Sequence, residues 1–142
     1  MGVIVLVADD DPVRSERVRN LVERAGARPL AAGDRVEAMV LFVRCAPDLT
    51  LVQDGLSADR GVELCKDMKT LRAGRGRTVV LLAARRPGSR RAALESACDA
   101  CVQQPFEDAT LIRTVRRLLS IRRGAALRKR VRPGGVSDEK GT

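Results

Sequence analysis

The sequence predicts an α/β fold, in which helices cover both faces of a doubly wound, five-stranded parallel sheet. Two continuous apolar runs, residues 3–8 and 79–84, have the composition of strands buried on both faces of such a sheet. Five short strand-like segments also alternate with five segments of helical periodicity. The chain has 142 residues, enough for one compact domain and too few for two ordinary ones. We therefore expect a single layered domain.

The predicted strands define where a functional site would lie. They are residues 3–8, 29–32, 49–53, 78–84 and 100–103, of which 29–32 has the weakest signal. In a doubly wound sheet, ligands bind at the carboxyl ends of the strands, where the strand order reverses. The candidate site is therefore formed by residues 9–11, 53–54, 83–84 and 103–104.

Capping and breaking residues mark the helices. Asp11 and Asp34 are each placed to cap the first turn of a helix, and Pro12 suits such a turn. Gly26 and Pro47 end these two helices. Further helices are predicted around residues 64–71, 90–97 and 111–119, and a polar loop precedes residue 61. The apolar stripe expected to face the core from the second helix is Val36, Met39, Val40 and Val43.

The composition excludes several classes of function. No apolar run approaches the roughly 20 residues of a transmembrane helix, and no signal peptide precedes the first run, so we expect a cytoplasmic protein. The chain contains no His, which removes imidazole bases and His metal ligands. Phe42 and Phe106 are its only aromatic residues, too few for base stacking. Without a nucleophile–base pair or a phosphate-binding glycine loop, we do not expect an enzyme.

Four cysteines are present: Cys45, Cys65, Cys98 and Cys101. Cys98 and Cys101 have the spacing of a redox pair or of half a zinc site, but no His or second pair accompanies them. An intracellular chain with this apolar content does not need disulfides. We therefore expect buried free thiols that fill the core.

The net charge of +9 is concentrated towards the C-terminus. Residues 1–112 contain 17 basic and 16 acidic side chains, whereas residues 113–132 contain nine basic and no acidic ones. Because the apolar periodicity ends near Arg123, we expect a folded domain over residues 1–122 and a basic, disordered tail or linker over residues 123–142. The basic cluster is either a solvated surface or an anchor for nucleic acid, an acidic protein or an anionic membrane.

Four sequence segments together resemble a known family. They are 7–12 (VADDDP) at the end of the first strand, 47–49 (PDL) entering the third, 61–65 (GVELC) at a helix start and 105–106 (PF) after the fifth strand. At these separations the chain is similar, over residues 3 to about 122, to the receiver domain of two-component response regulators. The resemblance implies a flavodoxin-like receiver fold with strand order 2-1-3-4-5.

The resemblance also implies a phosphorylation site. In the family, two acidic residues after the first strand bind Mg²⁺, and an Asp ending the third strand accepts a phosphoryl group. A Ser or Thr ending the fourth strand and a Lys before the Pro-Phe pair hold the phosphoryl oxygens. Here Asp9 and Asp10 match the acidic pair, but the three later positions hold Gln53, Ala83 and Gln104.

These departures predict a degenerate receiver, or pseudo-receiver, that has lost its phosphorylation switch. The family's aromatic switch position in the fifth strand also departs, since it holds Cys101. A further hypothesis is that Gln53 and Gln104 hydrogen-bond across the pocket and hold one conformation. Strand alternation predicts that Asp54 faces away from the pocket, unless a loop turns it back. No cofactor is required, and any Mg²⁺ at the acidic pair binds weakly because the carboxylate at position 53 is missing.

Three functions remain as hypotheses. The favoured one is a phosphorylation-independent module that binds an acidic face of another signalling protein through the predicted helix at 90–97, the strand at 100–103 and the helix at 111–119, the fourth helix, fifth strand and fifth helix expected from the sequence. The alternatives are a receiver phosphorylated at Asp54 and a regulator that binds nucleic acid non-specifically through residues 122–132. The arginines expected on the favoured surface are Arg90, Arg91, Arg113, Arg116 and Arg117.

Overall fold

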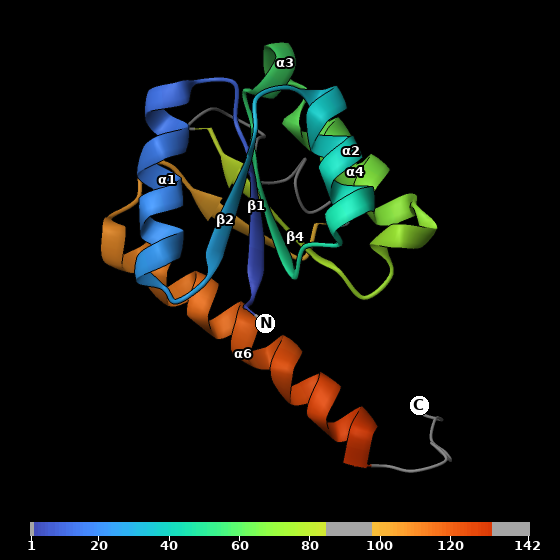
Figure 1. Ribbon diagram of the computed structural model, residues 1–142. Coiled ribbons are helices and arrows are strands. Elements are labelled where there is room, and N and C mark those ends of the chain that lie inside the picture. Colours follow the sequence, from blue (N-terminus) through green and yellow to red (C-terminus); the bar gives the residue numbers. More distant parts are fainter. Residues whose placement is uncertain (1, 85–97, 132–142) are drawn as a thin grey trace.

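The computed structural model describes residues 2–84 and 98–131. A five-stranded sheet, ordered β2-β1-β3-β4-β5, lies at its centre, and every neighbouring pair of strands is parallel (Figure 1). This order confirms the predicted fold class, and each strand begins and ends within one residue of its predicted bounds. The strands are β1 (Ile4–Ala8), β2 (Arg28–Ala32), β3 (Leu49–Gln53), β4 (Thr78–Ala83) and β5 (Ala100–Gln103).

Helices cover both faces of this sheet. α1 (Pro12–Arg24) and α6 (Asp108–Val131) pack on one face, and α2 (Arg35–Cys45) and α4 (Gly61–Thr70) pack on the other (Figure 1). The short helix α3 (Leu56–Asp59) and the 3₁₀ turn η1 (Arg72–Gly74) connect these layers to the strands. In the described part of the chain, no helix is both long and apolar enough to cross a membrane.

The two faces of the sheet bury separate apolar clusters, because side chains alternate along each strand. The cluster beneath α1 and α6 includes Leu51 and Leu82, and the opposite cluster, beneath α2 and α4, includes Val52 and Leu81. All five residues of β3 are buried. This strand therefore contributes to both cores, and its carboxyl end is held firmly in place.

Local sequence signals account for the helix starts. The carboxylate of Asp11 accepts hydrogen bonds from the first-turn amides of α1, and Asp34 caps α2 in the same way, as predicted. Gly61 opens α4 where two backbones approach closely: a Cβ at this position would lie 2.2 Å from the carbonyl oxygen of Gln53. Glycine therefore allows α4 to begin directly beside the end of β3.

The predicted core face of α2 is wrong. The helix buries Ala38 and Phe42, with Met39 partly buried beside them. Successive residues of a helix are rotated by about 100° around its axis, so Val40 lies about 200° from Phe42. When the Phe42 ring faces the core, the valine side of the helix therefore faces solvent. The exposed residues, predicted to be internal, are Val36, Val40 and Val43.

α6 is longer than the sequence predicts. The helix continues to Val131, although the apolar periodicity ends near Arg123. Residues 125–130 (AALRKR) have high helix propensity, so the helix can continue after its apolar stripe has ended. The domain boundary at residue 122 stays a prediction. The helix predicted at 90–97 and the last part of the predicted tail, 132–142, lie outside the described residues.

Candidate functional site

The candidate site lies at the carboxyl edge of the sheet. Asp9 follows β1, Gln53 ends β3, Ala83 ends β4 and Gln104 follows β5. The parallel register brings these ends together along one edge. The strand β2 lies on one side of β1, and the later strands β3, β4 and β5 lie on the other side. The strand order therefore reverses at β1, and this edge contains the switch point of the sheet.

Gln53 and Gln104 form a closed amide pair across this edge. Nε2 of Gln53 donates to Oε1 of Gln104 at 3.1 Å, and Nε2 of Gln104 donates to Oε1 of Gln53 at 3.0 Å. The Gln104 amide also donates to the carbonyl oxygen of Leu82 at 3.0 Å, and Gln53 is only 2% exposed. The hypothesis that these side chains hydrogen-bond across the pocket is confirmed; that they hold one conformation stays a prediction.

Asp54 is used inside the fold. β3 ends at Gln53, and the next carboxylate turns towards β4, where its Oδ2 accepts a hydrogen bond from the Ala84 amide at 2.9 Å. The Asp54 amide donates to the carbonyl oxygen of Leu82 at 3.1 Å, and its carbonyl accepts from Gly61 at 3.1 Å. The residue is 1% exposed. Its side chain therefore ties the ends of two strands together at a buried position.

Three of the four cysteines, Cys65, Cys98 and Cys101, belong to the core beneath α2 and α4. All four are free thiols, as expected, but only Cys65 is fully buried, and the other three are half-buried. The pKa of Cys65 is raised mainly by a hydrogen bond with Cys98 and, to a smaller extent, by burial, so this thiol keeps its proton. Cys101, at the family's aromatic switch position, packs against the same cluster as Cys98. This placement is that of core-filling side chains.

Arg14 holds the acidic cluster that follows β1. Its Nε and one terminal nitrogen donate to the two carboxylate oxygens of Asp9 at 2.8 and 2.7 Å. The guanidinium also lies 3.7 Å from Asp10 and 3.9 Å from Asp11. The hydrogen bonds to Asp9, with the surrounding negative charge, raise the pKa of Arg14 although burial opposes this. The sequence signal for this contact, which our prediction missed, is a basic residue in the first turn of a helix that Asp11 caps.

The acidic residues as placed here do not fit Mg²⁺. This ion prefers octahedral oxygen ligands at about 2.1 Å. Both oxygens of Asp9 face Arg14, one oxygen of Asp10 accepts from the Ser57 amide at 3.1 Å, and Asp11 caps α1. Over residues 2–84 and 98–131, no group of three or more acidic or thiol side chains is placed to hold a metal ion. Binding of Mg²⁺ would require these contacts to rearrange.

The predicted partner surface is described only in part. Arg113 and Arg117 are exposed one turn apart on α6. Arg116 is also exposed, but it donates to the carbonyl oxygen of Arg24 at 3.0 Å and so leans towards the end of α1. Arg90 and Arg91, the two arginines predicted on the helix at residues 90–97, lie outside the described residues.

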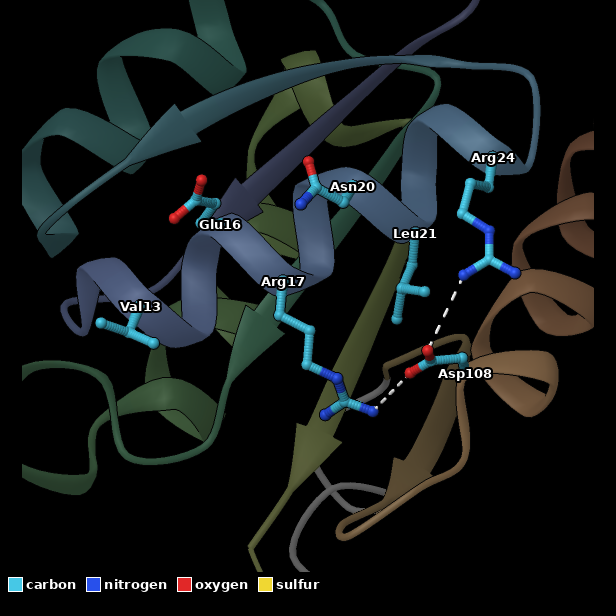
Figure 2. A pocket seen from close by; sticks show the side chains of 7 residues that line it. All are labelled: Val13, Glu16, Arg17, Asn20, Leu21, Arg24 and Asp108. Atoms are coloured by element: carbon cyan, nitrogen blue, oxygen red, sulfur yellow. Dashed lines mark hydrogen bonds and ion pairs between the residues drawn. The ribbon is translucent and has the colours of Figure 1, made fainter.

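A groove of about 350 Å³ between α1 and the start of α6 was not predicted (Figure 2). Arg17 lies 2.8 Å and Arg24 lies 3.7 Å from the carboxylate of Asp108, and both point into the groove (Figure 2). The Arg17 guanidinium also lies over the ring of Phe106, 4.9 Å from its centre. These contacts fasten α6 to α1, so the groove is a feature of helix packing.

Comparison with known proteins agrees with this geometry. The response regulator receiver domain family matches residues 5–116. The chain is 31% identical over 113 residues to the DNA-binding response regulator MtrA of Mycolicibacterium smegmatis (strain ATCC 700084 / mc(2)155). That alignment covers 79% of this chain and 48% of the relative, so the chain spans about half the length of the curated relatives it matches.

Solved structures share the same fold at low sequence identity. The response regulator receiver domain protein (CheY-like) from Methanospirillum hungatei JF-1 has a TM-score of 0.78 at 18% identity, covering 88% of this chain and 99% of that one. The receiver domain of sensor histidine kinase PA1611 from Pseudomonas aeruginosa PAO1 has a TM-score of 0.76 at 22% identity, covering 84% and 99%. That structure has a magnesium ion coordinated in its active-site cleft. With its strand order and a family match over most of its length, this chain belongs to the receiver domains of two-component response regulators.

Proposed function

We propose that this receiver domain is a pseudo-receiver: a phosphorylation-independent module that binds another signalling protein and is not an enzyme. The observation that carries the proposal is the amide pair of Gln53 and Gln104, joined by hydrogen bonds of 3.1 and 3.0 Å. These residues stand where the resemblance places the acceptor Asp and the phosphate-binding Lys. Both side chains are neutral, and each amide donates a hydrogen bond to the other. These two positions therefore supply neither a nucleophile nor a cation.

The chemistry of acyl phosphate formation supports this proposal. A carboxylate oxygen must attack phosphorus while the donor's leaving group departs with the bonding electron pair. The carboxamide of Gln53 does not form an acyl phosphate, and Gln104 has no charge to offset the negative charge that develops on the phosphoryl oxygens. Ala83 also lacks the hydroxyl expected at the end of β4. Three separate contributions to phosphoryl transfer are therefore missing.

Asp54 is the alternative acceptor, and its surroundings weigh against that role. The side chain is almost fully buried, and one of its oxygens already accepts the Ala84 amide at 2.9 Å. A phosphodonor would have to displace this contact and reach a carboxylate enclosed between β4 and α4. The missing charge at Gln104 and hydroxyl at Ala83 would still be absent.

The partner we propose has an acidic face, and α6 supplies the complementary charge. Arg113 and Arg117 are exposed on this helix, with Arg116 beside them. Such surfaces steer association and make it sensitive to salt. Residues 122–131 also belong to α6, and they include five of the nine basic residues of segment 113–132. Non-specific binding of nucleic acid through residues 122–132 therefore stays the second alternative.

Intact-mass measurement tests the proposal directly. The protein is incubated with Mg²⁺ and acetyl phosphate, then kept cold and near neutral pH so that an acyl phosphate would survive. We expect no added phosphoryl group, while a receiver domain with an intact acceptor Asp gains one under the same conditions. A phosphoryl group that is present in the wild type and absent in Asp54→Asn would contradict the proposal and establish the alternative acceptor.

A further inference from the structure

We propose that Arg14 is the resident cation of the acidic site and that it excludes a divalent metal ion from it. The contacts that support this role surround Asp9, which follows β1. Strand β1 lies on the opposite side of β3 from β4 and β5, so this role of Arg14 is independent of whether the domain is phosphorylated. Three carboxylates follow β1 in succession, and the guanidinium of Arg14 lies within 4 Å of all three. One positive side chain thus stands where the family would place Mg²⁺.

Both carboxylate oxygens of Asp9 are occupied by hydrogen bonds from Arg14. The Asp9 side chain is 0% exposed, and its two oxygens accept parallel hydrogen bonds from the guanidinium at 2.8 and 2.7 Å. Such a bidentate pair is stronger and more directional than a single charged hydrogen bond. The Asp11 amide adds a further hydrogen bond to the same carboxylate at 2.9 Å. No oxygen of Asp9 is left facing an open coordination position.

The other two carboxylates are only partly available. Asp11 Oδ1 accepts the amides of Val13 and Arg14 at 3.0 and 3.2 Å, and Asp10 Oδ2 accepts the Ser57 amide. Their remaining oxygens lie 3.7 and 3.9 Å from the Arg14 guanidinium. A metal ion approaching them would face a fixed positive charge at that distance, and like charges so close repel strongly.

Removing the guanidinium should therefore open a metal site. Without Arg14, the buried carboxylate of Asp9 and the neighbouring Asp10 and Asp11 would present uncompensated negative charge to solvent ions. Carboxylate oxygens are the ligands that Mg²⁺ and Mn²⁺ prefer. The binding of a divalent ion would then replace the charge compensation that Arg14 supplies in the wild type.

Titration with Mn²⁺, followed by the electron paramagnetic resonance signal of the free ion, tests this inference. The method suits a chain without Trp. We expect weak binding by the wild type and at least about tenfold tighter binding by Arg14→Met, with Mg²⁺ competing for the same site. Arg19→Met is the matched control: it removes one guanidinium from the same helix, where the side chain donates to the Ser15 hydroxyl at 3.2 Å.

Each outcome of this titration decides the inference. Tight Mn²⁺ binding by the wild type, equal affinities for wild type and Arg14→Met, or an equal gain in Arg19→Met would overturn it. Arg14→Gln, which keeps a donor for Asp9 without the charge, should show the same gain as Arg14→Met. If a variant is unfolded in metal-free buffer, Mn²⁺ should restore its folded circular dichroism spectrum, and failure to do so also contradicts the proposal.

Discussion

Gln53 and Gln104 meet through uncharged groups, so their contact should not change with pH or ionic strength between about pH 5 and 9. Asp9 and Arg14, at the end of the neighbouring strand β1, meet as a buried carboxylate and a guanidinium. Breaking such a pair by removing one partner leaves a buried charge uncompensated. The two contacts hold neighbouring parts of the pocket by different physical means, and variants of the two pairs should respond differently to salt.

The buried hydroxyl of Thr50 should lower the stability of the fold by a measurable amount. Thr50 lies in the centre of β3, 0% exposed, and its hydroxyl is the buried side-chain polar atom without a hydrogen-bond partner among the described residues. Burying an unsatisfied hydroxyl costs about 1–3 kcal/mol, and Val has nearly the same shape. We expect Thr50→Val to raise the free energy of unfolding by about 1 kcal/mol, measured by urea denaturation.

The control for this prediction is a threonine whose hydroxyl is satisfied. Thr114 donates to the carbonyl oxygen of Thr110 at 2.8 Å on α6, so Thr114→Val should give no comparable gain. A Thr50→Val protein that is less stable than the wild type would show that the hydroxyl has a partner after all.

At the scale of elements, strands could be predicted from the sequence more closely than helix faces. The bounds of β3 follow from its mostly apolar composition and the flanking Pro47 and Asp54, because a strand buried on both faces consists mainly of apolar side chains. In α2, two apolar stripes compete, and the burial of Phe42 decides between them. That choice depends on the shape of the space beneath the helix, which no local pattern contains.

α6 is the element on which the proposed partner binding depends. We expect the double charge reversal Arg113→Glu, Arg117→Glu to abolish capture of an acidic partner protein in a pull-down from cell extract, with the captured protein identified by mass spectrometry. Wild-type capture should also be lost at about 1 M salt, where the Debye length is about 3 Å. Both residues are exposed, so the variant should stay folded.

A control of equal charge separates this surface from net charge. Arg28→Glu, Arg44→Glu makes the same change in net charge at exposed positions on β2 and α2. This control should retain the partner. Loss of binding in both double variants, or capture that persists at high salt, would count against α6 as the binding surface.

At the scale of the whole molecule, the sheet separates two cores that should contribute independently to stability. Val22 of α1 belongs to one cluster and Met68 of α4 to the other. We expect the destabilisation of Val22→Ala, Met68→Ala to equal the sum of the single variants within about 0.5 kcal/mol, as for sites without shared partners. Val22→Ala combined with Val115→Ala, in one cluster, should deviate from its sum by more. Equal coupling in both pairs would contradict independence of the cores.

The pocket itself could be predicted residue by residue only where the strands fix positions. Gln53 and Gln104 end or follow strands whose register determines which side chains meet, so their contact followed from the topology. Arg14 reaches Asp9 through a long side chain from the first turn of α1, and its direction depends on rotamer and local charge. Charge compensation within the chain is therefore the part of the site that sequence spacing alone did not indicate.

α6 continues past the edge of the sheet, so its far turns stand away from the rest of the described residues (Figure 1). A compact chain of 142 residues has a radius of gyration of about 14.5 Å. Mass enters that radius as the square of its distance from the centre, so a projecting helix raises it more than its small volume suggests. The molecule should therefore diffuse more slowly than a sphere of equal mass, and it should tumble most slowly about the two axes perpendicular to its long axis.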